Sequence, residues 1–292
     1  FLQGGAELHA QSVDLYKTDF LELSPEYTND IEIELQDLLN KADLYIQQDQ
    51  YEQALQVLSQ ADDLAASMTG IDISKKILNS MANIYYSTGQ LKQAQRYYNE
   101  LVNQDEQDGS RGYLAVSLFN LGHVFASQEK YLEADEKFER SLQISQELED
   151  ESGIAFALKA LGVNAQAQNN RQLAEEHLIK ALSGFRKIDD QQQIAAIHRH
   201  LGDNALEDKN YVTAVEYYEK ALPLLAEQTS NSALLRTYRG LSDAYEALQE
   251  YGPALISHRA YTQLWQLQQQ QSSTETAQRL QVQFETQRYS DE

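Results

Sequence analysis

Hydrophobic and polar residues alternate along most of this chain with the period of an α-helix. The stretch from Leu118 to Phe138, LFNLGHVFASQEKYLEADEKF, holds two amphipathic segments joined by the polar turn SQEK. Apolar residues recur three and four positions apart on both sides of the turn, which is typical of helices that bury one face. The same arrangement returns around the turn EDKN at 207–210. The pattern therefore predicts an all-α protein built from paired helices.

Small residues recur every 40 positions within these segments. Steps of 40 through Gly122 meet a tiny residue each time: Ala42, Ala82, Gly122, Gly162, Gly202 and Ser242. Twelve positions after each lies an alanine: Ala54, Ala94, Ala134, Ala174, Ala214 and Ala254. A glycine inside a helix costs about 1 kcal/mol relative to alanine, and close packing of two helices can offset that cost. We therefore expect hairpins in which the tiny residue of the first helix crosses the alanine of the second.

The register divides the chain into six repeats between two terminal segments. The repeats cover approximately residues 35–71, 72–110, 111–150, 151–190, 191–230 and 231–270. Residues 1–34 are expected to form a capping helix, with Ala6 to Leu21 as its amphipathic part, or a linker, because the ends of repeat arrays usually need covering. Residues 271–292 are expected to extend the last helix beyond the repeats; a solvated or disordered tail is the alternative.

The repeat signature resembles the tetratricopeptide repeat family. In that family Leu-Gly, Tyr, Ala, Phe and Ala stand at fixed offsets, as Leu121-Gly122, Phe125, Ala134 and Phe138 do here. The resemblance covers roughly residues 35 to 262 and departs from the family in its period, 40 instead of the usual 34. It implies an all-α, right-handed superhelical solenoid of antiparallel helix pairs, whose concave side clasps peptides or proteins.

Composition narrows the possible partners. The formal net charge is −22, so phosphate backbones and anionic lipid surfaces are repelled and nucleic-acid binding is not expected. There is no cysteine, which excludes disulfides and thiolate chemistry. No apolar run reaches the length of about 18 residues that spans a bilayer. Because the chain begins with Phe1, we expect it to be part of a longer protein whose signal or anchor lies outside it.

No catalytic or cofactor motif is present, so the chain is not expected to be an enzyme or to hold a cofactor. Nucleophile-elbow, zinc-protease, P-loop and dinucleotide motifs are all missing. His198 and His200 lie two residues apart on a helix and cannot chelate one metal ion together. No metal site is predicted.

A ligand-binding groove is predicted instead along the first helix of each pair. Its candidate residues stand mainly three positions before or one after the tiny residue: Asn79, Asn83, Tyr86, Asn120, His123, Lys159, Arg199, Asp203, Arg236, Arg239 and Asp243. Arginine and lysine bind carboxylates, whereas asparagine can bond both to N–H and to C=O groups of an extended peptide.

The charged members of this set have an equally weighted alternative. Arg199 with Asp203, and Arg239 with Asp243, stand four residues apart and could simply pair within their own helices. Asp203 could also pair with Arg239 of the next repeat. Lys159 and Arg236 have no acidic residue four positions on, so they are the stronger ligand candidates.

A second resemblance concerns the C-terminal segment. The order Tyr261, Leu264, Ala277-x-x-Leu280-x-x-x-Phe284 is similar to the segment that closes many bacterial repeat-containing membrane sensors. It implies the periplasmic input region of a transmembrane diguanylate cyclase or histidine kinase that senses a peptide, protein or small anionic ligand, with the membrane reached only through segments outside this chain. The alternative is a cytoplasmic adaptor or peptide-responsive regulator. The C-terminal helix could also pair with its copy to form a homodimer.

Overall fold

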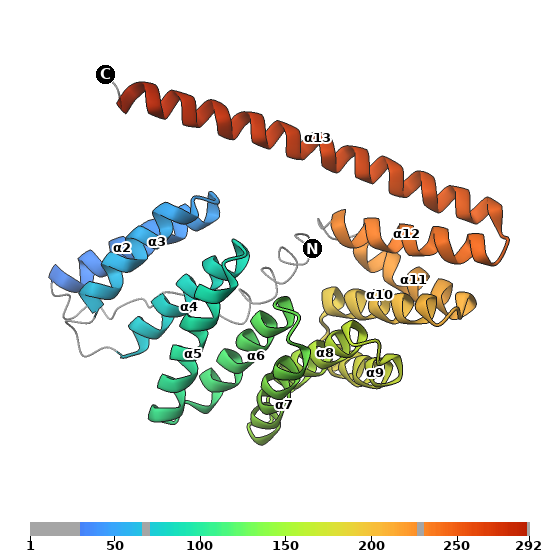
Figure 1. Ribbon diagram of the computed structural model, residues 1–292, viewed down its shortest axis with the longest axis horizontal. Helices are drawn as coiled ribbons and strands as arrows, with labels where there is room; N and C mark the ends of the chain where they lie inside the picture. The colour runs from blue at the N-terminus through green and yellow to red at the C-terminus, as the bar shows by residue number, and fades with distance from the viewer. Residues whose placement is uncertain (1–29, 66–70, 227–230, 291–292) are drawn as a thin grey trace. The chain divides into compact units, whose positions relative to one another are not determined.

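The computed structural model describes residues 30–65, 71–226 and 231–290, and these residues form α-helices without a strand (Figure 1). The described helices are α2 (Asp30–Gln47), α3 (Tyr51–Ala65), α4 (Ile71–Ser87), α5 (Leu91–Asp108), α6 (Arg111–Ser127), α7 (Tyr131–Glu147), α8 (Glu151–Ala167), α9 (Arg171–Lys187), α10 (Gln191–Glu207), α11 (Tyr211–Ala226), α12 (Asn231–Ala247) and α13 (Tyr251–Ser290). The all-α class predicted from the sequence is confirmed. The capping helix expected within residues 1–34 falls mostly outside the described residues.

The helices come in antiparallel pairs that follow the 40-residue period. From α4 onward the first helix of each pair begins at residue 71, 111, 151, 191 or 231. Each pair is closed by a short turn, and α2 packs on α3, α4 on α5, α6 on α7, α10 on α11 and α12 on α13. The regular start points show that the hydrophobic pattern sets the length of every hairpin.

Each turn inside a hairpin has the same backbone geometry. One residue in it takes a left-handed conformation, and it is Gly89 in one turn but Glu129 or Lys209 in others. The following amide then bonds back five residues, as Lys130 N does to the Phe125 carbonyl at 3.0 Å. This six-to-one bond is the usual way in which a helix end satisfies its last carbonyls.

The chain divides into two compact units, Phe1–Asn164 and Ala165–Glu292, and each is described here by itself. In the first unit, apolar residues of α2 to α6 form the core, and Tyr98, Leu101 and Leu118 are almost completely buried. In the second unit the core lies between α10, α11 and α12 around Tyr218 and Leu241. These cores hold the first helix of each pair in place, and with it the predicted groove residues.

Gly122 and Gly202 each lie against an aromatic ring from the second helix of their hairpin. A carbon added to Gly122 would lie 2.5 Å from Phe138 Cε1, and one added to Gly202 would lie 2.6 Å from Tyr218 Cε1. Ala134 is fully buried, but it is not among the atoms nearest to that carbon. The crossing of glycine on alanine stays a prediction, and the ring contact is the feature that the structure adds. The glycine makes room for the flat face of the residue sixteen positions later.

The described helices show features of neither a membrane span nor a metal site. None of them combines the length and the apolar character that crossing a membrane requires. Over the same residues, no group of three His, Asp or Glu side chains is arranged to hold a metal ion.

Candidate functional site

The predicted groove residues differ widely in exposure. Asn79, Asn83, Tyr86, Asn120, Lys159 and Arg199 are buried, His123 and Asp203 are half-buried, and Arg236, Arg239 and Asp243 are exposed. In the first unit they lie on α4, α6 and α8, and in the second on α10 and α12. The contacts within each unit show which of these side chains already have hydrogen-bond or ion-pair partners.

Asn83 is held by a tyrosine from the second helix of its hairpin. The Tyr98 hydroxyl on α5 donates a hydrogen bond to Asn83 Oδ1 on α4. Because the carbonyl end of the amide accepts this bond, the orientation of the Asn83 side chain is set, and its NH₂ group is directed away from Tyr98. Asn83 is therefore pre-oriented as a hydrogen-bond donor.

Asn79 and Asn120 have polar atoms that meet no partner among the described residues. Asn120 is 3% exposed, and both its Oδ1 and its Nδ2 are buried without a hydrogen bond. Asn79 is 2% exposed, and its Oδ1 is in the same situation. More than nine in ten buried polar groups in proteins are bonded, and each exception costs about 1–3 kcal/mol. Two neighbouring repeats thus carry an amide that lacks a partner.

His123 lies inside an aromatic cluster next to a lysine. Its ring meets Phe119 edge to face at 4.5 Å between centroids and Phe138 at 5.0 Å. Burial, together with the nearby Lys159 cation, lowers the pKa of His123 from 6.5 to about 3. The Lys159 ammonium itself lies 5.7 Å from the ring centroid of Phe156. His123 is consequently a neutral imidazole at physiological pH.

Tyr86 links the first helices of two successive repeats. Its hydroxyl lies 2.9 Å from Ser127 Oγ on α6. Burial raises the pKa of Tyr86, so the hydroxyl keeps its proton. This bond joins α4 to α6 beside the asparagines.

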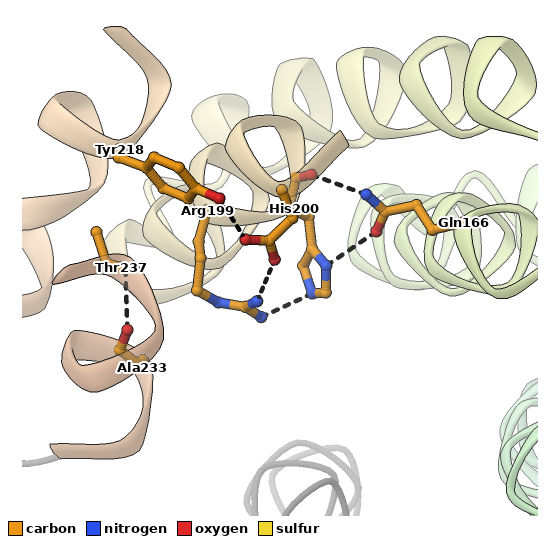
Figure 2. Close-up of polar contacts among 7 residues, drawn as sticks. Gln166, Arg199, His200, Tyr218, Ala233 and Thr237 are labelled. Carbon is orange, nitrogen blue, oxygen red and sulfur yellow. Dashed lines mark hydrogen bonds and ion pairs between the residues drawn. The ribbon is translucent and has the colours of Figure 1, made fainter. Parts of the chain in front are cut away.

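In the second unit the charged residues neutralise one another, as Figure 2 shows. Arg199 Nη1 donates to Asp203 Oδ2 at 2.8 Å, and the Tyr218 hydroxyl donates to Asp203 Oδ1 at 2.8 Å. Of the two readings of Arg199 and Asp203, internal pairing is therefore observed. Burial and the Asp203 carboxylate raise the pKa of Tyr218, so its hydroxyl remains a donor.

The same arginine also orients His200. Arg199 Nη2 lies 2.9 Å from His200 Nε2, and a guanidinium can only donate, so Nε2 accepts. The proton of the imidazole is then on Nδ1, which donates to Gln166 Oε1 at 3.1 Å. Gln166 Nε2 returns a bond of 2.8 Å to the His200 carbonyl (Figure 2). One imidazole thus joins the end of α8 to α10.

The two arginines of α12 are more exposed to solvent than Arg199. Arg236 and Arg239 are exposed, and within the described residues no ion pair joins Arg239 to Asp243. Thr237, between the two arginines, is fully buried and donates to the Ala233 carbonyl of its own helix at 2.9 Å. Both arginine side chains therefore lie at the surface of α12.

Sequence reasoning missed the tyrosines that position the groove residues. Tyr98 and Tyr218 stand sixteen positions after the tiny residue, and each bonds the polar side chain one position after it, Asn83 or Asp203. In a third repeat Phe138 stands at this place and contacts His123. A tyrosine fifteen positions after an asparagine or aspartate was a readable signal, but only once both helices were known to face each other.

Models of a known repeat family match several of these helix pairs. A tetratricopeptide repeat model matches residues 74–146 and 113–187, and a second one matches residues 38–67. These segments are tetratricopeptide repeats. No curated protein matches the chain in sequence.

Solved structures with the same fold extend over most of the chain. BtubC (BKLC) from P. vanneervenii has a TM-score of 0.61 at 16% identity, covering 83% of this chain and 93% of that one. A Rap protein complexed with Competence and Sporulation Factor has a TM-score of 0.63 at 15% identity, covering 84% and 78%. PilF of Pseudomonas aeruginosa has a TM-score of 0.59 at 18% identity, covering 85% and 100%. At these identities the likeness concerns the fold.

Proposed function

We propose that this tetratricopeptide repeat domain binds an extended peptide segment through the amides of α4 and α6. The observation that carries the proposal is Asn120, which is 3% exposed with both amide atoms unbonded within the described residues. A peptide backbone offers one N–H and one C=O per residue, so it can satisfy both atoms of an asparagine at once. Binding would remove a penalty that the free protein carries.

Neighbouring residues support the same assignment. Asn79 adds a second unbonded carbonyl, and Asn83 presents a donor oriented by Tyr98. His123 is a neutral imidazole, so it adds no charge of its own to this part of the face. Among proteins with this fold, the Rap structure was solved with a bound factor, Competence and Sporulation Factor.

In the second unit, considered by itself, Arg236 and Arg239 remain the sequence-level candidates for binding a carboxylate. Both are exposed on α12, in a chain of net charge −22. Arg199 is engaged by Asp203 and His200, so its charge is already compensated within this unit. Lys159, a stronger candidate at the sequence level, is buried against Phe156 and is assigned a packing role.

An immobilised array of random ten-residue peptides provides the test, with binding of the tightest peptide then followed by fluorescence polarisation. The double variant Asn79→Leu with Asn120→Leu should lose binding while remaining folded, because leucine keeps the volume but offers no hydrogen bond. Asn204→Leu is the matched control: Asn204 is also a buried asparagine, but its Nδ2 already donates to the Arg171 carbonyl at 3.0 Å. Equal binding by the wild type and the double variant would falsify the proposal.

The biological setting is part of the same proposal. We assign the domain to the periplasmic sensory input of a bacterial transmembrane diguanylate cyclase or histidine kinase, with a ligand-binding and non-catalytic role. The support is the C-terminal sequence resemblance and the uninterrupted helix α13, which continues to Ser290. The encoding gene should contain a hydrophobic span on each side of this segment. A gene without such spans would assign the same peptide-binding role to a cytoplasmic regulator.

A further inference from the structure

The last described helix carries an unpartnered interface. Within the second unit, α11 packs against α10 on one side and against α12 on the other. Tyr211, Val215 and Tyr218 of α11 belong to one core cluster with Leu241 of α12, and Tyr218 contacts both Gly202 on α10 and Gly240 on α12. Leu225 packs in a second cluster with Ala233 of α12. Helix α13 packs against α12 through Ala254 and Ser257, both buried. On the side of α13 where a following repeat would pack, no described helix lies against it.

Residues 40 positions on from the α11 contacts define this side. Tyr251, Leu255, His258 and Trp265 correspond to Tyr211, Val215, Tyr218 and Leu225. We call these four residues of α13 the open stripe. Tyr251 is 66% exposed, Leu255 50% and Trp265 48%, whereas Leu225 is 2% exposed. The open stripe thus repeats register positions that contribute to the contact between α11 and α12, and no described helix covers it.

Spacing and charge indicate what covers the open stripe. Its members follow one another at intervals of four, three and seven residues, which is the spacing of a coiled-coil seam. The segment Tyr251–Thr274 contains no aspartate or glutamate, in a chain that has 45 of them. Between two copies of this segment the acidic repulsion that opposes self-association elsewhere is therefore missing. Its many glutamines can also pair with themselves, because each amide both donates and accepts.

We infer that the open stripe binds the open stripe of a second copy of this chain, which makes the protein a symmetric dimer. In such a contact the same patch serves both partners, so a seam that is apolar and free of acidic residues is self-complementary. The dimer contact lies at residues 251–265 and not in the C-terminal extension. Helix α13 extends well past the end of α12 (Figure 1), so the paired helices would continue beyond the repeats.

Sedimentation of the whole chain tests the inference. The wild type should sediment with twice the 33.2 kDa mass of one chain. Tyr251→Glu with Leu255→Glu should halve that mass. Ile256→Glu with Leu267→Glu is the matched control, because both residues are exposed on the opposite flank of α13 and the charge change is equal. Removal of residues 271–292 should leave the dimer intact.

Trp265 supplies an independent readout, since it is the chain's single tryptophan. Its emission should shift to longer wavelength when the wild type is diluted, and should be at the longer wavelength at every concentration in the Tyr251→Glu, Leu255→Glu variant. Circular dichroism verifies that each variant keeps its helices. A wild type of single-chain mass at all concentrations, equal dissociation by both glutamate pairs, or loss of the dimer on truncation would each overturn the inference.

Discussion

The ring of Phe138 occupies the place where a side chain on Gly122 would stand. The distance from a carbon added at Gly122 to Phe138 Cε1 is 2.5 Å, which is too short for an unshifted contact. The glycine at position 122 is therefore required by a specific aromatic neighbour. The same relation holds between Gly202 and Tyr218.

Gly122→Ala should lower stability although alanine is the better helix former. Pushing a methyl group into a packed core costs about 1–3 kcal/mol, which exceeds or cancels the gain in helix propensity of about 1 kcal/mol. Gly112→Ala in the same helix is the control, because nothing lies within 4 Å of a carbon added there. It should raise stability slightly. Urea unfolding of both variants measures the difference; a stabilised Gly122→Ala protein would contradict the contact.

Asn120→Leu should stabilise the free protein, by about 1–3 kcal/mol, because it removes a buried amide that has no described partner. Asn204→Leu should have the opposite effect, since it breaks the bond to the Arg171 carbonyl and leaves that carbonyl without its donor. Thermal unfolding midpoints of the two variants check the prediction. If Asn120→Leu were as destabilising as Asn204→Leu, an unseen partner would have to satisfy Asn120.

Lys75→Met should be the most destabilising single change of those proposed here. Lys75 Nζ lies 2.7 Å from Asp105 Oδ1, and the two side chains are 6% and 1% exposed. Removing one partner of a buried ion pair leaves an uncompensated charge and costs about 3–5 kcal/mol.

A double variant of this ion pair and a variant of an exposed pair separate the effect of buried charge from that of packing. Lys75→Met with Asp105→Leu should recover most of the lost stability, because no charge is then left buried. Arg140→Met breaks the exposed pair between Arg140 and Glu106 and should cost less than about 1 kcal/mol. Denaturant unfolding of the three proteins ranks the effects, and a double variant as unstable as Lys75→Met would refute this account.

Acid should destabilise the protein through its buried histidines. The pKa of His123 is lowered to about 3, so below the ordinary value of 6.5 the unfolded chain takes up a proton that the folded chain does not. Stability should thus be fully present above 6.5 and fall as the pH decreases toward 3. His198, with its pKa lowered to about 4 by burial and two nearby cations, acts in the same direction.

His123→Phe should reduce this pH dependence, because phenylalanine fits the aromatic cluster and does not titrate. Unfolding followed at several pH values between 6.5 and 4 checks the effect. Titration of the His123 ring by NMR gives a direct control: ring signals that move near pH 6.5 would show that the imidazole is hydrated and refute the assignment.

Much of the fold could be read from the chain because its causes are local. Helix amphipathicity and the spacing of Ala54, Ala94 and Ala134 are properties of single segments, and they place the hairpins correctly. The bond from Arg199 to Asp203 was equally readable, since four residues of helix bring any such pair together. Tyr98 and Tyr218 escaped notice because each acts on another helix.

The sequence by itself determined which residues form helices and which face of each helix turns inward, because the hydrophobic period and the positions of small residues act within one hairpin. Only the tertiary structure decided which of the inward-facing polar groups have a hydrogen-bond partner and which do not. Arg199 is neutralised, Asn83 is oriented and Asn120 is left unbonded according to what neighbouring helices place within about 3 Å, the reach of a hydrogen bond. Hydrogen bonding depends on distances between helices, and no periodicity within a helix encodes those distances.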